Sequence, residues 1–326
     1  NAILRSVIRE QDSIGVEDLA SNDIEVISFI YNIPLWLIDL WMGEFGRDKT
    51  EDLCAWFNQQ PKLTARINTI LIDIPQCLTL LKEQGWDVSQ DSNYKDIIYI
   101  NSHRGSLEKS DAVIKGYITF MDKASMLVAR LVNPQPGERV LDCCAAPGGK
   151  SMYMAALMDN TGSLMSCDIH EHKIALMESN AQRLGISIVQ TKVQDATELP
   201  SAWKSYFDRV LVDVPCSGLG ILQKKLDMRW RKDESTLSEL PPLQLAILER
   251  AAMTVKEKGY LVYSTCTLNY KENEDVVEAF LQKHKEFSIV PVGADFPLKS
   301  NNGMITTYPP TDDMDGFFMA RMKRLS

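Results

Sequence analysis

Two cysteines, Cys216 and Cys266, stand 50 positions apart in similar local contexts. Each follows a short apolar run that predicts a buried strand, over residues 209–213 and 259–263. In an open α/β sheet, the residues just beyond the carboxyl ends of parallel strands face the ligand crevice. We therefore predict that both thiols lie at the edge of one pocket and serve in thiol-assisted group transfer.

The other five cysteines have no such context. A lone cysteine usually packs as a small apolar residue, and we expect this of Cys54, Cys77 and Cys167. Cys143 and Cys144 come at the end of another predicted strand and are expected to line the pocket or pack behind it. The sequence contains no CxxC pair, which disfavours a zinc site and a dithiol oxidoreductase, so no bound metal is expected.

A glycine-rich turn upstream of both cysteines joins a predicted strand, residues 139–143, to a predicted helix that ends near residue 158. Glycine lets a ligand approach the backbone, and a helix N-terminus favours an anionic group. The turn matches neither the GxxxxGK[ST] nor the GxGxxG pattern, and a purely structural turn is the alternative. The turn residues that we expect to contact a ligand are Cys144, Ala145, Ala146, Pro147, Gly148, Gly149 and Lys150.

Three carboxylates, Asp168, Asp195 and Asp213, end three successive predicted strands. Asp168, about 20 residues after the turn, is placed to bind the hydroxyl groups of an adenosine ribose. Asp195 is placed to reach the adenine amino group. An acidic pocket with a single lysine does not balance a triphosphate and its Mg²⁺. S-adenosylmethionine (SAM) carries one carboxylate, a sulfonium cation and no phosphate, so SAM is the predicted cofactor.

A thiol beside a methyl donor suits methylation of cytosine at C5, which is a poor nucleophile. A thiolate that adds to C6 makes C5 enamine-like, so that C5 can attack an electrophilic methyl group; a base then removes the C5 proton and the thiol leaves. This chemistry needs a cysteine, an acid near N3 of the base and a bound methyl donor. Cys266, Asp213 and the glycine-rich turn supply these residue types.

The bulk composition describes an ordinary globular protein. With 326 residues, 45% hydrophobic and 24% charged, the chain is long enough for two or three domains. No signal peptide and no apolar stretch of the roughly 20 residues that span a bilayer is present. Seven scattered cysteines indicate reduced thiols rather than a disulfide framework. We expect a cytoplasmic monomer without membrane contact, and the absence of an initial Met indicates a fragment or a trimmed chain.

The net charge of −9 argues weakly against a nucleic-acid partner, but its local distribution matters more. Five cations fall within nine positions directly after the Cys216 segment, against Asp227 alone. A solvated charged loop is the plain alternative. Because the segment lies beside the predicted pocket, we favour contacts with RNA phosphates by Lys224, Lys225, Arg229, Arg231 and Lys232.

The pattern of elements divides the chain into three parts. Residues 1–60 predict helices, with Thr50 as an N-cap, and residues 61–114 predict a small α+β domain that binds RNA. In residues 115–326, strands alternate with helices, including a long helix from about residue 242 to 256. This alternation predicts a Rossmann-like α/β domain with a mostly parallel, doubly wound sheet.

Taken in order, these motifs resemble the bacterial RNA 5-methylcytosine methyltransferases of the Sun/Fmu type. The resemblance covers about residues 115–326 and includes residues 144–150, Asp168, Asp195, 213–220, 230–231, 243–244, 263–267, 272–274 and 315–320. It implies that the turn and the three aspartates bind SAM and that Cys266 is the nucleophile. It also implies that Cys216 assists product release.

The start of the chain resembles one branch of that family, the small-subunit ribosomal RNA methyltransferase B enzymes. Residues 1–5 look like the tail of a NusB-like RNA-binding domain, and residues 34–38 and 58–68 resemble the linker and small domain of that branch. The resemblance implies methylation of small-subunit (16S) ribosomal RNA. The alternatives are the same chemistry on tRNA or at another rRNA site, and a non-catalytic RNA-binding assembly factor, against which both retained cysteines argue.

Overall fold

The computed structural model describes residues 23–232, 234–293 and 296–325. The predicted NusB-like tail, residues 1–5, therefore lies outside the described residues. The chain divides into two compact units, which are described separately. One comprises residues up to 60 together with 222–234, and the other comprises residues 61–221 together with 235–326.

The first unit is helical. Its elements are α2 (Asp23–Tyr31), α3 (Leu35–Phe45), α4 (Arg47–Phe57) and the short α10 (Met228–Arg231). Their apolar faces share a small core in which Trp41 packs on Phe57 with ring centroids 5.6 Å apart. Pro34 precedes α3, where its fixed φ suits helix initiation.

The predicted N-cap at Thr50 is wrong. Gly46 has a left-handed φ of 78° and separates α3 from α4, so α4 begins three residues before Thr50. The Thr50 hydroxyl instead donates to the carbonyl of Gly46 at 2.8 Å, inside the helix. Among the described residues, no single helix is long and apolar enough to cross a membrane; α2 and α3 meet that criterion only as a pair bent by 117°.

The second unit begins with a small antiparallel sheet of order β2-β3-β1-β4. Its strands are β1 (Leu63–Ile67), β2 (Asp87–Gln90), β3 (Ile97–Ser102) and β4 (Ile118–Phe120), and α5 (Ile74–Glu83) and α6 (Asp111–Ile114) accompany them. An ion pair joins this sheet to the rest of the unit: Arg130 lies 2.5 Å from Asp96, whose other oxygen accepts the Tyr153 hydroxyl at 2.6 Å.

The larger sheet has the order β10-β12-β9-β8-β5-β6-β7, with β11 paired to β12. The five strands β9, β8, β5, β6 and β7 run parallel, and β12 is antiparallel to β9. The predicted mostly parallel, doubly wound sheet is therefore confirmed. The strands are β5 (Arg139–Asp142), β6 (Ser163–Asp168), β7 (Val189–Val193), β8 (Phe207–Asp213), β9 (Val255–Thr265), β10 (Phe287–Ile289), β11 (Met304–Thr306) and β12 (Phe318–Arg324).

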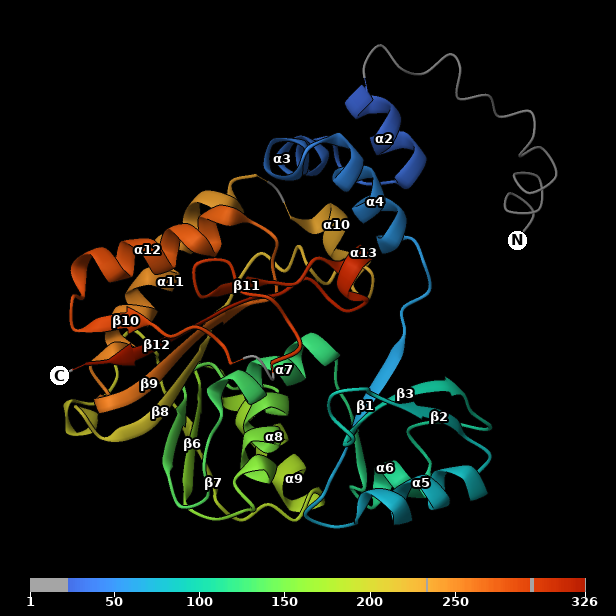
Figure 1. Ribbon diagram of the computed structural model, residues 1–326, viewed down its shortest axis with the longest axis vertical. Coiled ribbons are helices and arrows are strands. Elements are labelled where there is room, and N and C mark those ends of the chain that lie inside the picture. Colours follow the sequence, from blue (N-terminus) through green and yellow to red (C-terminus); the bar gives the residue numbers. More distant parts are fainter. Residues whose placement is uncertain (1–22, 233, 294–295, 326) are drawn as a thin grey trace. The chain divides into compact units, whose positions relative to one another are not determined.

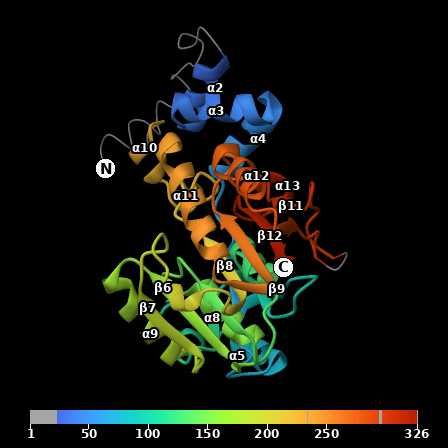
Figure 2. The same ribbon diagram turned by 90° about the vertical axis from the view of Figure 1, so that its left-hand side faces the viewer.

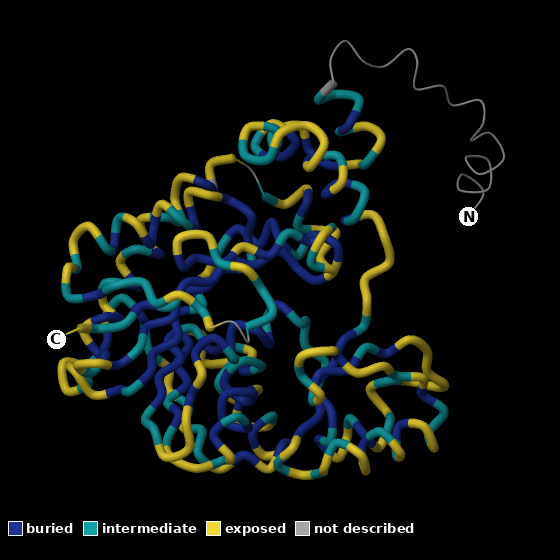
Figure 3. The backbone as a smooth tube through the Cα atoms, in the orientation of Figure 1, coloured by how far each residue is buried: buried dark blue, intermediate teal, exposed yellow. Residues whose placement is uncertain are grey.

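Helices cover both faces of this sheet (Figures 1 and 2). One core lies under α7 (Lys123–Val132), α8 (Gly149–Leu157) and α9 (Glu171–Arg183). The other lies under α11 (Thr236–Ala252) and α12 (Glu274–Lys283). Figure 3 shows that most residues of the strands between these helix layers are buried. The remaining elements are the short helices η2 (Ser201–Trp203), η3 (Tyr270–Glu272) and α13 (Pro309–Asp312).

The long helix α11 begins earlier than predicted. Its first residue is Thr236, so Pro241 and Pro242 lie inside the helix. Each proline removes one backbone donor, which is why the sequence favoured a start at Pro242. Leu237, in the first turn of the helix, is buried, which favours the earlier start. The helix also ends at Ala252 rather than near residue 256, because β9 begins at Val255.

Candidate active site

The candidate site lies at the carboxyl edge of the parallel strands. Asp142, Asp168, Asp213 and Thr265 are the last residues of β5, β6, β8 and β9. The chain runs outward from β5 through β6 to β7 and returns on the other side through β8 and β9. The chain changes direction between β5 and β8, and open α/β sheets bind ligands in the crevice that forms at this edge beside such a point.

The glycine-rich turn leads from β5 into α8. Gly148 has a φ of 98°, and a Cβ at this position would lie 3.1 Å from Cγ of Met177. Glycine is therefore required both by the backbone conformation and by the space. The amide of Ala145 donates to the carbonyl of Cys167 at 2.7 Å, which fixes the turn against β6.

Asp168 and Asp195 lie on adjacent strand ends, as the sequence predicted. Asp168 is largely buried and accepts from the amides of Ala146 at 3.3 Å and His170 at 3.0 Å. Asp195 follows β7 and accepts from the amide and the hydroxyl of Thr197, two hydrogen bonds that lower the pKa of its carboxyl. Both carboxylates are thus held in place by local donors at the crevice.

Asp142 is a site residue that the sequence analysis missed. Its Oδ2 accepts from the Ser151 hydroxyl at 2.6 Å, while its buried Oδ1 has no partner among the described residues. Burial raises the pKa of this carboxyl from its ordinary value of 3.8 to about 7. Its position, directly before Cys143 at the end of a predicted strand, was the available signal.

Lys150 and Asp213 form an ion pair that joins α8 to β8. Lys150 Nζ donates to Asp213 Oδ2 at 2.7 Å, and the Ser264 hydroxyl donates to Asp213 Oδ1, also at 2.7 Å. Burial lowers the pKa of Lys150, but the charge of Asp213 and its hydrogen bond outweigh this and raise it. Lys150 therefore stays a cation, and its charge also acts on Cys266.

The structure brings the two predicted thiols into contact. Cys216 Sγ lies 3.2 Å from Cys266 Sγ, and it accepts the backbone amide of Cys266 at 3.3 Å. The amide of Gly220 donates to the carbonyl of Cys266 at 3.0 Å. The segment of Cys216 and the segment of Cys266 therefore pack against each other, although one follows β8 and the other follows β9.

The thiols differ in their electrostatic surroundings. The hydrogen bond to Cys266, together with burial, raises the pKa of Cys216 well above its ordinary value. The raised pKa favours the protonated form of Cys216, while the geometry of the contact allows either sulfur to be the donor. Burial likewise raises the pKa of Cys143 and of Cys144 well above their ordinary values, so neither is suited to act as a nucleophile.

The cationic segment lies in the first unit, and the structure divides its members. Lys224, Lys225 and Arg231 are exposed and Lys232 is half-buried. Arg229 is only 4% exposed and donates to the carbonyl of Phe57 at 2.7 Å and to the side chain of Asn58 at 2.8 Å. The predicted contact of Arg229 with RNA is wrong, because this guanidinium satisfies oxygens at the end of α4.

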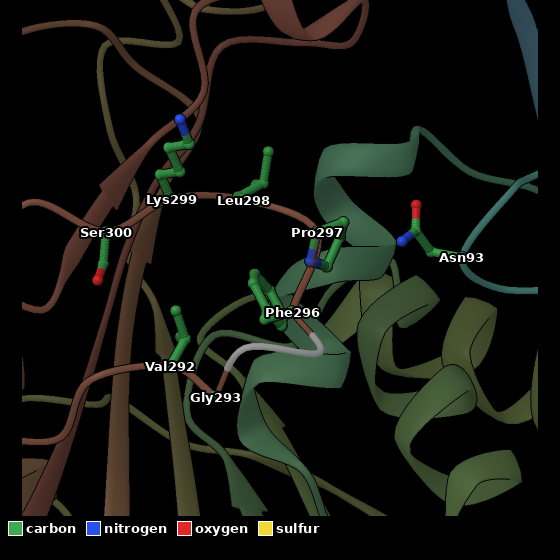
Figure 4. A pocket seen from close by; sticks show the side chains of 8 residues that line it. All are labelled: Asn93, Val292, Gly293, Phe296, Pro297, Leu298, Lys299 and Ser300. Atoms are coloured by element: carbon green, nitrogen blue, oxygen red, sulfur yellow. The ribbon is translucent and has the colours of Figure 1, made fainter.

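A separate cavity of about 820 Å³ lies in the second unit, beside α7 (Figure 4). It is formed by Asn93 and by the segment that precedes β11, and its lining includes Phe296 and Lys299. None of the candidate site residues lines it. Its side chains of Val292, Phe296 and Leu298 pack against the core under α7.

The chain is similar to known proteins over almost its whole length. Residues 129–323 match the family model described as 16S rRNA methyltransferase RsmB/F, and residues 33–105 match that of an RsmF/B-like ferredoxin-like domain. The chain is 34% identical over 330 residues to the probable ribosomal RNA small subunit methyltransferase B of Bacillus subtilis, in a match that covers 99% of this chain and 73% of that protein.

Two solved structures are similar to this chain. The crystal structure of PH0851 matches 93% of this chain and 69% of its own with a TM-score of 0.87 and 32% identity. A methyltransferase homolog protein from Pyrococcus horikoshii matches 94% of this chain and 100% of its own with a TM-score of 0.82 and 23% identity. The second likeness concerns the fold alone.

Proposed function

The chain belongs to the 16S rRNA methyltransferase RsmB/F family, whose members use SAM, and from this premise we propose that it methylates C5 of a cytosine in small-subunit ribosomal RNA. In this proposal the base is activated by a covalent bond between Cys266 and C6. The observation that carries it is the contact of 3.2 Å between Cys266 and Cys216 beside the ion pair of Lys150 and Asp213.

The crevice fits SAM. Gly148 lets the turn adopt a φ of 98° between β5 and α8, and the backbone of this turn would bind the methionine end of the cofactor. Asp168 and Asp195 would accept hydrogen bonds from the ribose and the adenine amino group. When bound, SAM supplies an electrophilic methyl group, and no metal is needed to deliver it.

Cys266 is assigned the attack on C6. Its sulfur lies against two groups that can stabilise charge at the site, the thiol of Cys216 at 3.2 Å and the ammonium of Lys150. Addition of the Cys266 sulfur to C6 places electron density on C5, which becomes the carbon that takes the methyl group. One thiol is sufficient for this step.

Asp213 is assigned to the polar edge of the base. Because Lys150 neutralises Asp213, this carboxylate is an acceptor, suited to the amino group at C4 or to a protonated N3. N3 takes up a proton from solvent as the sulfur adds to C6, and Asp213 would accept a hydrogen bond from the protonated N3. The expectation of an acid near N3 stays a prediction.

Cys216 is assigned the release of the product. After methylation, the C5 proton must leave before the bond between Cys266 and C6 can break. In the resting site Cys216 is a thiol. Once the sulfur of Cys266 is bonded to C6, Cys216 would lose its proton to solvent and its thiolate would take the C5 proton; the electrons of the C5–H bond then form the C5–C6 double bond, and the Cys266 sulfur leaves with the electrons of its bond to C6.

The test uses labelled RNA and SAM on a denaturing gel. Cys266→Ala is expected to abolish turnover and to form no covalent RNA complex. Cys216→Ala is expected to methylate once and to remain linked to the RNA. A complex formed by Cys266→Ala, with normal turnover of Cys216→Ala, would reverse the two roles. Mapping 5-methylcytosine in RNA from cells that lack the protein separates the rRNA target from tRNA and from a non-catalytic assembly role.

A further inference from the structure

We infer that Glu272 and Asn273 are positioning residues, with Glu272 holding the segment of Cys216 and Asn273 holding the segment of Cys266. The inference rests on the proposed function and adds a division of labour to it. Within the described part of the chain, neither side chain forms a hydrogen bond with a sulfur atom. Each acts on the neighbours of one thiol, and together they set the separation of 3.2 Å.

The carboxylate of Glu272 is fully buried and accepts four hydrogen bonds. Oε2 accepts from the amide of Ser217 and from Nε2 of Gln244, each at 2.9 Å. Oε1 accepts from the hydroxyl of Ser217 at 2.5 Å and from Nδ2 of Asn269 at 2.9 Å. A carboxylate offers about four acceptor positions, and here all four are filled.

These contacts bind the segment of Cys216 from both sides. Ser217, which follows Cys216 directly, gives both its amide and its hydroxyl to Glu272. Gln244, which donates to Glu272, also donates to the carbonyl of Pro215 at 3.0 Å, on the other side of Cys216. Among the described residues, no lysine or arginine forms an ion pair with Glu272, so hydrogen bonds alone compensate its charge.

Asn273 holds the segment of Cys266 in the same way. Its Oδ1 accepts from the hydroxyl of Thr265 at 2.6 Å, and its Nδ2 donates to the carbonyl of Thr267 at 3.0 Å. These two residues flank Cys266. The side-chain amide of Asn273 matches both partners, because Thr265 offers a hydroxyl donor and Thr267 offers a carbonyl acceptor. Neither an aspartate nor a leucine could serve both.

The two held segments also contact each other. The hydroxyls of Ser217 and Thr267 lie 2.7 Å apart, and the Tyr263 hydroxyl donates to the carbonyl of Glu272 at 2.6 Å.

The division of labour has a specific consequence. Loss of Glu272 should impair the step that needs Cys216, and loss of Asn273 should impair the step that needs Cys266. A residue that merely stabilised the fold would impair both.

The test is a double-mutant comparison that uses the trapped RNA complex of Cys216→Ala. Glu272→Gln alone should accumulate the complex about 10-fold over the parent protein, because release is slowed. In the Cys216→Ala background, Glu272→Gln should leave the rate of complex formation unchanged, whereas Asn273→Asp should lower it about 10-fold. Asp275→Asn, an exposed change in the first turn of α12, is the matched control.

A second measurement does not depend on methylation. Diamide oxidises two adjacent thiols to a disulfide and takes up two electrons and two protons, and its rate for Cys216 with Cys266 reports how well the thiols are held together. Glu272→Gln and Asn273→Asp should each slow the formation of this disulfide, whereas Asp275→Asn should leave its rate unchanged. Affinity for SAM, measured by calorimetry, should stay within about twofold in all three, which shows that the crevice is intact.

The outcomes separate the two ideas. If Cys216→Ala forms no RNA complex, the proposed function fails, and the diamide rates still decide the positioning role. If Glu272→Gln slows complex formation in the Cys216→Ala background as much as Asn273→Asp does, the division of labour is overturned. Unchanged diamide rates in both variants would overturn the positioning role itself.

Discussion

Nζ of Lys150 lies 2.7 Å from Oδ2 of Asp213, and this pair connects the turn after β5 with the end of β8. Lys150 lies in the first turn of α8, directly after β5, and Asp213 ends β8; β5 and β8 are the neighbouring strands between which the chain changes direction. In the proposed function, the ion pair stands where the methyl donor and the base would meet. Its charges are largely shielded from water, since the Lys150 side chain is 14% exposed, so each charge acts strongly on its neighbours.

The first prediction concerns Lys150. Lys150→Met removes the cation that pairs with Asp213 beside the two thiols, so single-turnover methylation should slow by about 10²–10³-fold. Methionine keeps the length and packing of the chain. Rapid-quench measurement of methyl transfer checks this, with SAM affinity as the control. A rate within about threefold of the parent would remove Lys150 from the mechanism.

The second prediction concerns Asp142 and pH. Because its folded pKa of about 7 lies above its ordinary value of 3.8, the folded state retains a proton that the unfolded chain loses. The resulting stability is fully present below pH 3.8 and is lost as the pH rises through about 7. Over this range the loss amounts to at most about 4 kcal/mol.

Asp142→Asn keeps the shape but cannot ionise, so its free energy of unfolding should fall less between about pH 4.5 and pH 8 than that of the parent, by up to about 3 kcal/mol. Urea denaturation at the two pH values measures both proteins. All other groups titrate in both proteins, so the difference between their pH dependences of unfolding free energy reports Asp142 alone. Equal pH dependence in the two proteins would mean that Asp142 is ionised in the folded state throughout.

The third prediction divides the cationic segment. Charge reversal at Lys225 and Arg231, which are exposed, should weaken RNA binding and reduce its dependence on salt, by about one unit of slope for each phosphate that is no longer neutralised. Arg229→Ala should instead lower thermal stability, because it leaves the carbonyl of Phe57 without its buried donor. Filter binding across salt concentrations and thermal melting distinguish the effects. An unchanged salt slope after reversal would make the segment a solvated loop.

Much of the candidate site could be predicted because its signals are local. A polar residue after a short apolar run marks a carboxyl strand end, and parallel strands bring such ends to one edge; this placed Asp168, Asp213 and Cys266 correctly. The glycine at 148 is likewise dictated by its own backbone conformation. Such features need no knowledge of distant partners.

The remainder depends on contacts between distant residues. Arg229 donates to oxygens of Phe57 and Asn58, which lie 172 and 171 positions earlier in the chain. The residues adjacent to Arg229 in the sequence give no sign of these partners. Glu272 receives donors from Ser217, 55 positions earlier, so its role could not be read from its own surroundings. The start of α11 followed tertiary burial rather than the local preference of proline.

The last prediction concerns the cofactor and compares two carboxylates. Asp168→Ala should weaken SAM binding by about 1–3 kcal/mol, because it removes the ribose acceptor and also frees the amides of Ala146 and His170 that shape the turn. Asp195→Ala should weaken binding less, since Asp195 is the more exposed of the two and already shares its oxygen with Thr197. Isothermal calorimetry with SAM measures both, and Cys266→Ala, which removes no cofactor contact, serves as the control. Unchanged affinity in Asp168→Ala would place the adenosine elsewhere. An equal loss in both aspartate variants would contradict the distinct roles assigned to ribose and adenine.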